Sequence, residues 1–327
     1  MGAQVKVVCV TGATGFIGKH LIQELSKTGS KIKILSRGGK TVPENVEVFI
    51  GDLVNPGNTI KDFLKDCDII FHCAGEIKES NLMEDLHISG IKKLMQLVNA
   101  ESNRSKKKIH WVQLSSVGAY GPPKNRIDEK REICELSPTF PANIYEITKT
   151  KSDELLINFA KEVENISYSI LRPSNVFGAD MTNNSLNKLI SLVRNRLFFY
   201  VGRKDAIATY VYVKDVCKAL ILLSNSSDAR NKIYILSNDC LLIDLVKEIA
   251  LILKVREPKI RIPLTIINVI VKIFNVFFSK LFLLPRLDLL ALTTRYNVSK
   301  IQSELGFEFD YPMPYSIKLM IRKNNDS

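Results

Sequence analysis

The sequence lacks the residue spacings that hold metal ions or disulfide frameworks. Its six cysteines include no Cys-x-x-Cys pair, and none has a histidine at metal-ligand spacing. This pattern predicts reduced thiols, no metal site and a cytoplasmic protein. The first residues also lack a basic stretch followed by an apolar segment and a cleavage site, so no secretory signal is expected.

Long uninterrupted apolar runs are missing as well. Residues 262–284 are strongly apolar, but Asn268, Lys272, Asn275 and Lys280 interrupt them. A membrane-crossing helix needs about 20 predominantly apolar residues. The segment therefore predicts one or two core or interface helices, and a helix lying on a membrane surface is the less favoured alternative.

Acidic residues are fewer than basic ones, 34 against 46, which gives a formal charge of +12. Such an excess suits nucleic acid, a membrane surface or a phosphate-bearing ligand. The basic runs at 106–108 and 130–131 are short and contain no aromatic residue. We read them as solvated loops rather than a nucleic-acid site.

Strand-length apolar runs alternate with helical patterns through the first two thirds of the 327 residues, as in βαβ units on a parallel sheet. The predicted strands are 5–10, 31–35, 46–50, 68–73, 109–114 and 168–171. The predicted helices are 16–28, 59–65, 82–100 and 144–163. After Arg172 the pattern changes to a loop at 175–185, a helix near 186–196, strands at 209–213 and 232–236, and mostly helix from 241 onward. We expect an α/β fold with a doubly wound parallel sheet and a smaller C-terminal lobe.

A glycine-rich turn, TGATGFIG at residues 11–18, follows the first predicted strand and opens the first predicted helix. Gly12 permits a tight turn, Gly15 lets a pyrophosphate approach the backbone, and Gly18 allows close packing of helix and strand. The unpaired amides and the dipole of the helix N-terminus then attract a diphosphate. This predicts a nicotinamide dinucleotide held by Gly12, Thr14, Gly15, Phe16, Ile17 and Gly18.

The chain is expected to contain two functional parts. Residues 1–174, with the strands and helix near 209–237, are expected to form a Rossmann domain that binds NADP or NAD. Residues 175–208 and 238–327 are expected to form the substrate-binding lobe.

The end of the second predicted strand reads Leu35-Ser36-Arg37. A carboxylate there would bind the ribose 2′-hydroxyl of NAD, whereas an arginine can fork onto the 2′-phosphate of NADP. The pattern favours NADP, leaves NAD possible, and leaves open that Arg37 is a solvent-facing loop residue. Further cofactor contacts are expected from Asp52 and Leu53 after the third strand and from Cys73, Ala74 and Gly75 after the fourth.

Tyr145 and Lys149 are four residues apart, so on a helix they share one face. A nearby ammonium and an oxidised nicotinamide both favour the phenolate, which suits Tyr145 to proton transfer and Lys149 to holding the nicotinamide ribose. Ser115 and Ser116 follow the fifth strand, where a hydroxyl can bind the substrate oxygen. Taken singly, these residues also fit an ordinary helix face and a turn.

Together these motifs resemble the extended short-chain dehydrogenase/reductase family, the epimerase, dehydratase and reductase group that acts on nucleotide sugars. The matching segments are 11–18, 51–53, 115–121, 145–149, 171–178, 210–216 and 304–307. The resemblance implies a catalytic set of Ser116, Tyr145 and Lys149, a cofactor contact at Pro173 and a substrate diphosphate contact at Asn175. It also implies a homodimer formed through helices 82–100 and 144–163.

The same resemblance narrows the reaction. Val117 and Gly118 stand where dehydratases of the family carry an acidic pair, which leaves a 4-epimerase or a 4-keto reductase acting on a UDP- or dTDP-sugar. Ala208 stands where many relatives carry an arginine that grips the diphosphate, so Arg203 or Arg286 is the expected replacement. His87 stands where asparagine is frequent.

Two alternatives stay open. A ketone or 3β-hydroxysteroid-type dehydrogenase shares these motifs and often has an apolar C-terminal region. A non-catalytic dinucleotide-binding protein is also conceivable, but it would have no need of the tyrosine.

Overall fold

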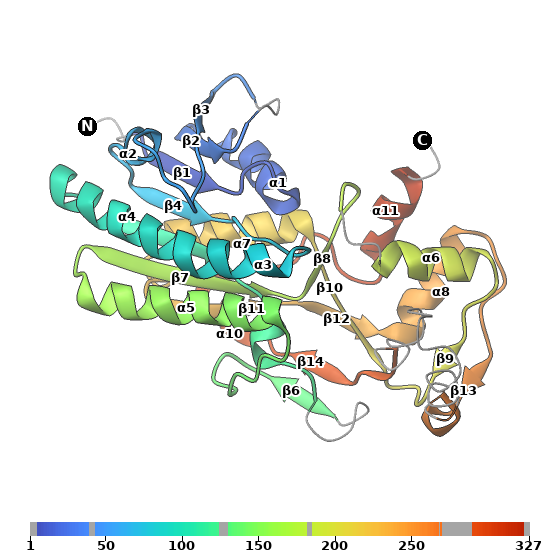
Figure 1. Cartoon of the computed structure of the whole chain (residues 1–327). Coiled ribbons are helices and arrows are strands. Elements are labelled where there is room, and N and C mark those ends of the chain that lie inside the picture. The colour runs from blue at the N-terminus through green and yellow to red at the C-terminus, as the bar shows by residue number, and fades with distance from the viewer. Residues whose placement is uncertain are drawn as a thin grey trace.

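The computed structural model describes residues 5–38, 43–123, 130–181, 185–267, 269 and 290–323. Its centre is a parallel seven-stranded sheet in the order β11-β7-β5-β4-β1-β2-β3 (Figure 1). The strands are β1 Val7–Thr11, β2 Lys31–Ser36, β3 Val46–Ile50, β4 Ile69–His72, β5 Ile109–Leu114, β7 Ile166–Pro173 and β11 Lys232–Leu236. The chain turns back at β1 and β4, so their carboxyl ends form the switch point where such sheets bind ligands.

Helices cover both faces of this sheet, as the alternation of strand and helix patterns predicts. On one face lie α1 Phe16–Leu25 and α7 Val213–Asn225, which contact each other. On the other lie α2 Thr59–Leu64, α4 Ile91–Ser105 and α5 Ile144–Glu162 (Figure 1). The expected doubly wound Rossmann architecture is confirmed.

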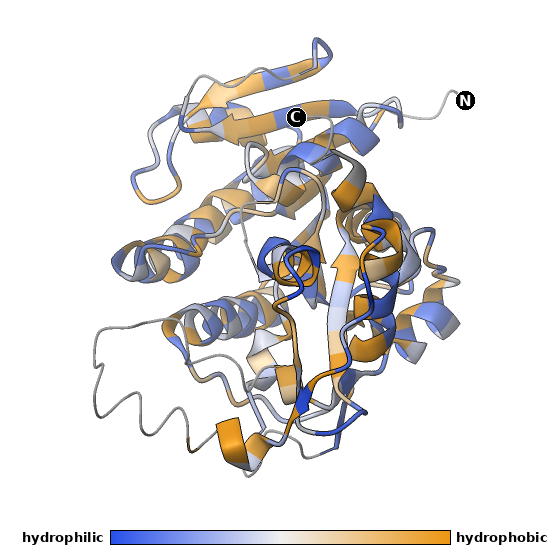
Figure 2. Ribbon diagram, turned by 90° about the vertical axis from the view of Figure 1, so that its right-hand side faces the viewer, coloured by the Kyte–Doolittle hydropathy of each residue, from blue (hydrophilic) through white to orange (hydrophobic). Residues whose placement is uncertain are grey.

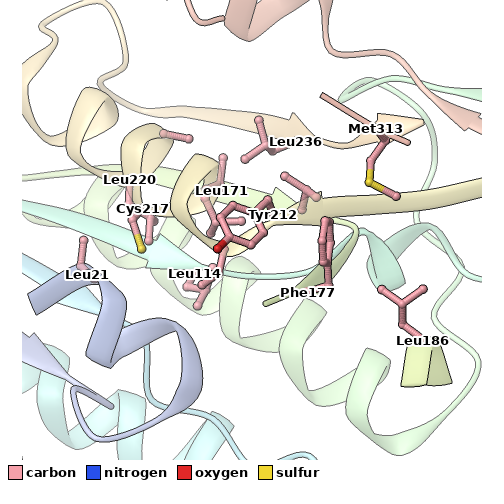
Figure 3. Close-up of a cluster of buried hydrophobic side chains, with 14 of the residues drawn as sticks. Leu21, Leu114, Leu171, Phe177, Leu186, Tyr212, Cys217, Leu220, Leu236 and Met313 are labelled. Atoms are coloured by element: carbon pink, nitrogen blue, oxygen red, sulfur yellow. The ribbon is translucent and has the colours of Figure 1, made fainter. Parts of the chain in front are cut away.

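The central strands are apolar on both sides because both faces are buried. Val8 and Val10 of β1 join the core under α1 and α7, whereas Cys9 between them joins the core under α2 and α4. Figure 3 shows how the first core continues from Leu21 and Leu114 through Tyr212 to Met313. Sheet and C-terminal segments therefore share one hydrophobic core.

Three small sheets build the lobe beside the carboxyl ends of the strands. Strands β8 Asn175–Phe177, β10 Ile207–Tyr212 and β12 Asn238–Leu241 form one of them. The others pair β9 Tyr200–Val201 with β13 Arg261–Ile262, and β6 Arg131–Ile133 with β14 Thr294–Tyr296. The accompanying helices are α6 Ser185–Arg194, α8 Leu242–Ile252, α10 Ser299–Leu305 and α11 Lys318–Lys323. Figure 2, which views the molecule from the side of the lobe, shows helices that carry both hydrophobic and hydrophilic residues, as expected of helices with one buried side.

Three expectations need correction. The strand expected near 209–213 does not join the large sheet; β10 pairs with β8 and β12, because the chain leaves the main sheet after β7 and returns only at β11. In the described part of the region after 241, the short strands β13 and β14 interrupt the helices, and strands of two or three residues give no periodic signal in the sequence. The helix expected over 82–100 consists of α3 Ser80–Glu84, a π-helical turn Asp85–Gly90 and α4.

The apolar stretch 262–284 lies mostly outside the described residues. Of its described part, Ile267 is buried against Val201 and Ala291, whereas Ile266 and Val269 are exposed. No helix in the described part of the chain is long and apolar enough to cross a membrane. All six cysteines are free thiols.

Candidate active site

The glycine turn joins β1 to α1 with almost no room for side chains. Gly12 has a φ of 70°, which only glycine adopts readily, and a Cβ there would lie 2.5 Å from the backbone nitrogen of Ala74. A Cβ on Gly18 would lie 2.1 Å from the carbonyl oxygen of Gly12. The turn is therefore as tight as a dinucleotide fingerprint requires.

The N-terminus of α1 is suited to a diphosphate. Gly15 is its N-cap residue and supplies no side-chain acceptor, and the first turn contains no acidic residue. The first amides of a helix have no partner within the helix, and the dipole favours an anion there. Phe16, Ile17 and Gly18 open this helix, so the residues present fit the pyrophosphate of a dinucleotide.

Arg37 lies at the end of β2 with an exposed side chain. The positive charge of Arg37 interacts with the carboxyl group of Glu76, which follows β4. Partial burial opposes ionisation of Glu76, but three backbone amides and the charge of Arg37 lower its pKa. Arg37 therefore lies beside the switch point, where the adenosine ribose binds in such folds.

Two loops near the switch point, one after β3 and one after β4, contain the further expected cofactor contacts. Asp52 accepts a hydrogen bond of 2.6 Å from the Val54 amide, while Leu53 is buried. Cys73 and Ala74 pass directly beside Gly12, and burial raises the pKa of the Cys73 thiol to about 12. Cys73 is thus a neutral packing residue at neutral pH and no nucleophile.

Tyr145 lies in the first turn of α5, whose N-cap Asn143 accepts a 3.0 Å hydrogen bond from the Glu146 amide. The phenol lies near the hydroxyl of Ser116, which caps the short turn after β5. Burial raises the pKa of Tyr145, and the neighbouring Ser116 hydroxyl opposes that rise. At neutral pH the phenol is protonated and lies beside a second hydroxyl.

Lys149 lies one turn further along α5 and is buried. Its Nζ donates a 2.7 Å hydrogen bond to the carbonyl oxygen of Leu114, at the end of β5. Burial lowers the pKa of Lys149, and the charge of Asp153 opposes this. The structure thus brings Ser116, Tyr145 and Lys149 together at the carboxyl edge of the sheet.

Ser115 does not face the substrate, contrary to the expectation. Its hydroxyl is buried and donates a 2.7 Å hydrogen bond to Oδ2 of Asp153. The same oxygen receives Arg172, which is also buried, at 3.0 Å. Sequence reasoning missed this pair, although Asp153 repeats the four-residue spacing of Tyr145 and Lys149.

Of the substrate-binding residues expected in the lobe, the structure describes Asn175 and Arg203. The Asn175 amide donates a 3.0 Å hydrogen bond to the carbonyl of Thr209, so β10 holds it in place. Arg203 forms an exposed ion pair of 3.1 Å with Asp205. Arg286 lies outside the described residues. Ala208 is buried in β10, and Pro173 ends β7 beside Leu236.

Comparison with known proteins agrees with this arrangement. The model of the NAD dependent epimerase/dehydratase family matches residues 8–236. The chain belongs to this family and so to the extended short-chain dehydrogenases/reductases, whose members here are epimerases and reductases. The resemblance carried by the motifs is thereby confirmed.

Three similar proteins illustrate the range of epimerases and reductases that the chain resembles. A Methanocaldococcus jannaschii protein, provisionally named UDP-glucose 4-epimerase, is 27% identical over 67% of this chain and 73% of its own. The 2-alkyl-3-oxoalkanoate reductase of Shewanella oneidensis is 25% identical over 73% of this chain and 63% of its own. The structure of the UDP-glucuronic acid 4-epimerase from Bacillus cereus in complex with NAD has a TM-score of 0.72, with 16% identity over 98% of this chain and 99% of that one.

Proposed function

We propose that this protein reduces the 4-keto group of a UDP- or dTDP-linked sugar with NADPH, or interconverts the 4-epimers of such a sugar. The observation that carries the proposal is the placement of Tyr145 near Ser116, with Lys149 one turn further along α5 and hydrogen-bonded to the end of β5. Proton transfer to a ketone oxygen needs a set of residues of this kind.

In the reductive direction each residue has a separate task. Tyr145 gives its proton to the ketone oxygen, and the raised pKa keeps that proton in place at neutral pH. Ser116 hydrogen-bonds the same oxygen and steadies the charge that develops on it. Lys149 holds the nicotinamide ribose and favours the transient phenolate. A bound nicotinamide supplies or accepts the hydride.

Arg37 supports NADP as the cofactor. It is exposed directly after β2, where the chain reads Ser36-Arg37 and has no carboxylate that would repel a 2′-phosphate. NADPH is the usual donor for ketone reduction, so the same residue favours the reductase over the epimerase.

The loop after Ser116 argues against a dehydratase. Val117 is buried, and a Cβ on Gly118 would already lie 2.8 Å from Cγ of Glu146. An acidic side chain at position 118 therefore has no room unless Glu146 moves. Water elimination needs an extra acid and base here, and neither Val117 nor Gly118 provides one.

A homodimer in the cytoplasm remains part of the proposal. Ile144 and Ile147 of α5 and Leu82 of α3 are between 40% and 46% exposed, and α3 contacts α5. Apolar side chains grouped on adjoining helices favour an interface between subunits. A monomeric mass in light scattering would contradict it.

Reduction of a lipophilic ketone, such as a 3-ketosteroid, is the second candidate. Ala208 is buried where a diphosphate-binding arginine is frequent, and Arg203 already pairs with Asp205. Similarity to an oxoalkanoate reductase points the same way.

One panel of assays separates these candidates. The purified protein is incubated with NADPH or NADH and UDP- and dTDP-4-keto-sugars or a 3-ketosteroid, and separately with NAD+ or NADP+ and UDP-glucose. The proposal predicts stoichiometric NADPH oxidation with a 4-keto-sugar. Isomerisation of UDP-glucose without net oxidation identifies the epimerase, and oxidation with the steroid alone overturns the sugar proposal.

A further inference from the structure

His87 lies in the π-helical turn Asp85–Gly90, between the loop after β4 and the catalytic helix α5. Its side chain is 2% exposed. Its ring lies 6.0 Å, centroid to centroid, from the ring of Tyr145 in an edge-to-face arrangement. A Cβ on Gly75 would be 3.3 Å from Nε2 of His87, so the ring directly underlies the loop expected to pass the cofactor.

Both ring nitrogens of His87 have hydrogen-bond partners. The amide of Glu76 donates to Nε2 at 2.9 Å, and Nδ1 lies 2.8 Å from the hydroxyl of Thr148. The Thr148 hydroxyl in turn lies 2.8 Å from the carbonyl oxygen of Ile144, which can only accept. Thr148 occupies α5 between Tyr145 and Lys149.

These partners determine where the protons lie. A backbone amide always donates, so Nε2 must be unprotonated, and the proton of a neutral ring is on Nδ1. Nδ1 then donates to Thr148, whose hydroxyl donates to Ile144. The result is a continuous chain of three hydrogen bonds that runs from the cofactor loop into the first turn of α5.

An acid or base role for His87 does not fit this environment. Burial, followed by the charge of Lys149, lowers its pKa to about 3, while Glu76 opposes the shift. The ring is neutral at physiological pH, and neither nitrogen is free to exchange a proton with substrate.

We propose that His87 is a positioning residue, which fixes the loop at Gly75 and Glu76 relative to Tyr145 through its hydrogen bond to Thr148. The proposal deepens the function given above and rests on it. A displacement of about 1 Å between cofactor and catalytic group is enough to cost a large factor in rate. A rigid link between the loop at Gly75 and Glu76 and the helix that carries Tyr145 therefore supports a high rate.

The first test is independent of any substrate. The protein has four histidines, and nitrogen-15 NMR of histidine-labelled protein distinguishes their tautomers. The signal that disappears in His87→Gln is assigned to His87. We expect the neutral ring with its proton on Nδ1 at neutral pH. A proton on Nε2, or a doubly protonated ring, overturns the proposal.

The second test removes one link of the chain. Thr148→Val keeps the shape of the side chain but leaves Nδ1 without an acceptor, and Thr148→Ser restores the hydroxyl. Thr150→Val is the matched control, because Thr150 is buried on the same helix and bonds only the Glu146 carbonyl among the contacts described for it. Thr148→Val should weaken NADPH binding about fivefold, the equivalent of one hydrogen bond.

With a sugar substrate, kcat of Thr148→Val should fall about tenfold while KM changes less than about twofold. Thr148→Ser should recover at least half of the turnover. Equal losses in Thr148→Val and Thr150→Val, or no recovery in Thr148→Ser, overturn the positioning role. If the wild-type protein reduces none of the sugars, the proposed function fails, whereas the tautomer and the NADPH affinities still decide the role of His87.

Discussion

The buried hydroxyl of Ser115 donates a 2.7 Å hydrogen bond to Oδ2 of Asp153, on the helix that also carries Tyr145 and Lys149. Ser115 directly follows β5 and precedes Ser116. The contact therefore fixes the position of one catalytic hydroxyl relative to the helix that carries the other. Arg172 of β7 forms an ion pair with the same oxygen of Asp153 at 3.0 Å, and its guanidinium lies over the ring of Tyr120.

Asp153→Asn should destabilise the protein. It leaves the Arg172 guanidinium buried without a counter-ion, and breaking such a pair costs about 3 kcal/mol. Urea denaturation measures the loss. Lys151→Ala is the control on the same helix, because its ion pair with Glu154 is half exposed and should change the free energy of unfolding by less than about 0.5 kcal/mol. Similar values for both variants would show that the buried pair is unimportant.

Tyr145→Phe should keep NADPH affinity and lose turnover by about 100-fold or more, the scale of general acid catalysis. The substitution removes only the hydroxyl of Tyr145 and leaves its ring and Ser116 in place. Titration calorimetry measures binding, and loss of nicotinamide absorbance measures turnover. A variant that retains near-normal turnover would remove Tyr145 from the mechanism.

Arg37→Ala should weaken NADPH binding about tenfold and leave NADH binding unchanged, because only NADPH carries the 2′-phosphate. Lys27→Ala is the control for charge, since Lys27 is exposed near the far end of α1 and pairs with Glu24. An equal effect of the two substitutions, or equal loss of both cofactors, would mean that Arg37 does not read the phosphate.

The free energy of unfolding should fall as the pH rises from about 4 to 6 because of Asp215. This buried carboxyl accepts the amides of Asp310 and Tyr311, yet burial raises its pKa to about 6 from the ordinary 3.8. The folded state therefore holds this proton more tightly than the unfolded state. Its stabilisation is fully present below pH 4 and is lost as the pH passes through 6, to an extent on the order of 3 kcal/mol.

Asp215→Asn removes this titration. The difference in unfolding free energy between wild type and variant, measured in urea at several pH values, should decrease across that interval. A difference that stays constant from pH 4 to pH 7 would show that Asp215 has an ordinary pKa.

The large sheet was predictable because its central strands, such as β4 and β5, are buried on both faces and leave continuous apolar runs. β3 and β5 have the predicted bounds, and β11 closes the sheet as a strand at 232–236. The two-residue strands β9 and β13 were not predictable, since pairing between distant segments creates them. The π-helical turn was equally hidden, because one extra residue per turn hardly changes the apolar spacing of residues 82–100.

The catalytic set was predictable for a different reason. Ser116, Tyr145 and Lys149 belong to local motifs whose order along the chain is informative. Which of two adjacent serines faces the helix depends instead on Asp153, a partner 38 residues from Ser115. The hydrogen bonds of His87 likewise join residues far apart in sequence, and no local pattern indicates them.

The most direct test of the proposed reaction follows deuterium. The protein is supplied with NADPH deuterated on the transferring face of the nicotinamide and with a UDP- or dTDP-4-keto-sugar, and the product is analysed by mass spectrometry. The proposed reductase predicts one deuterium on the new carbinol carbon, and formation of the same product at least about 100-fold more slowly with Tyr145→Phe. Unlabelled product, or labelled product formed equally fast by Tyr145→Phe, would contradict it.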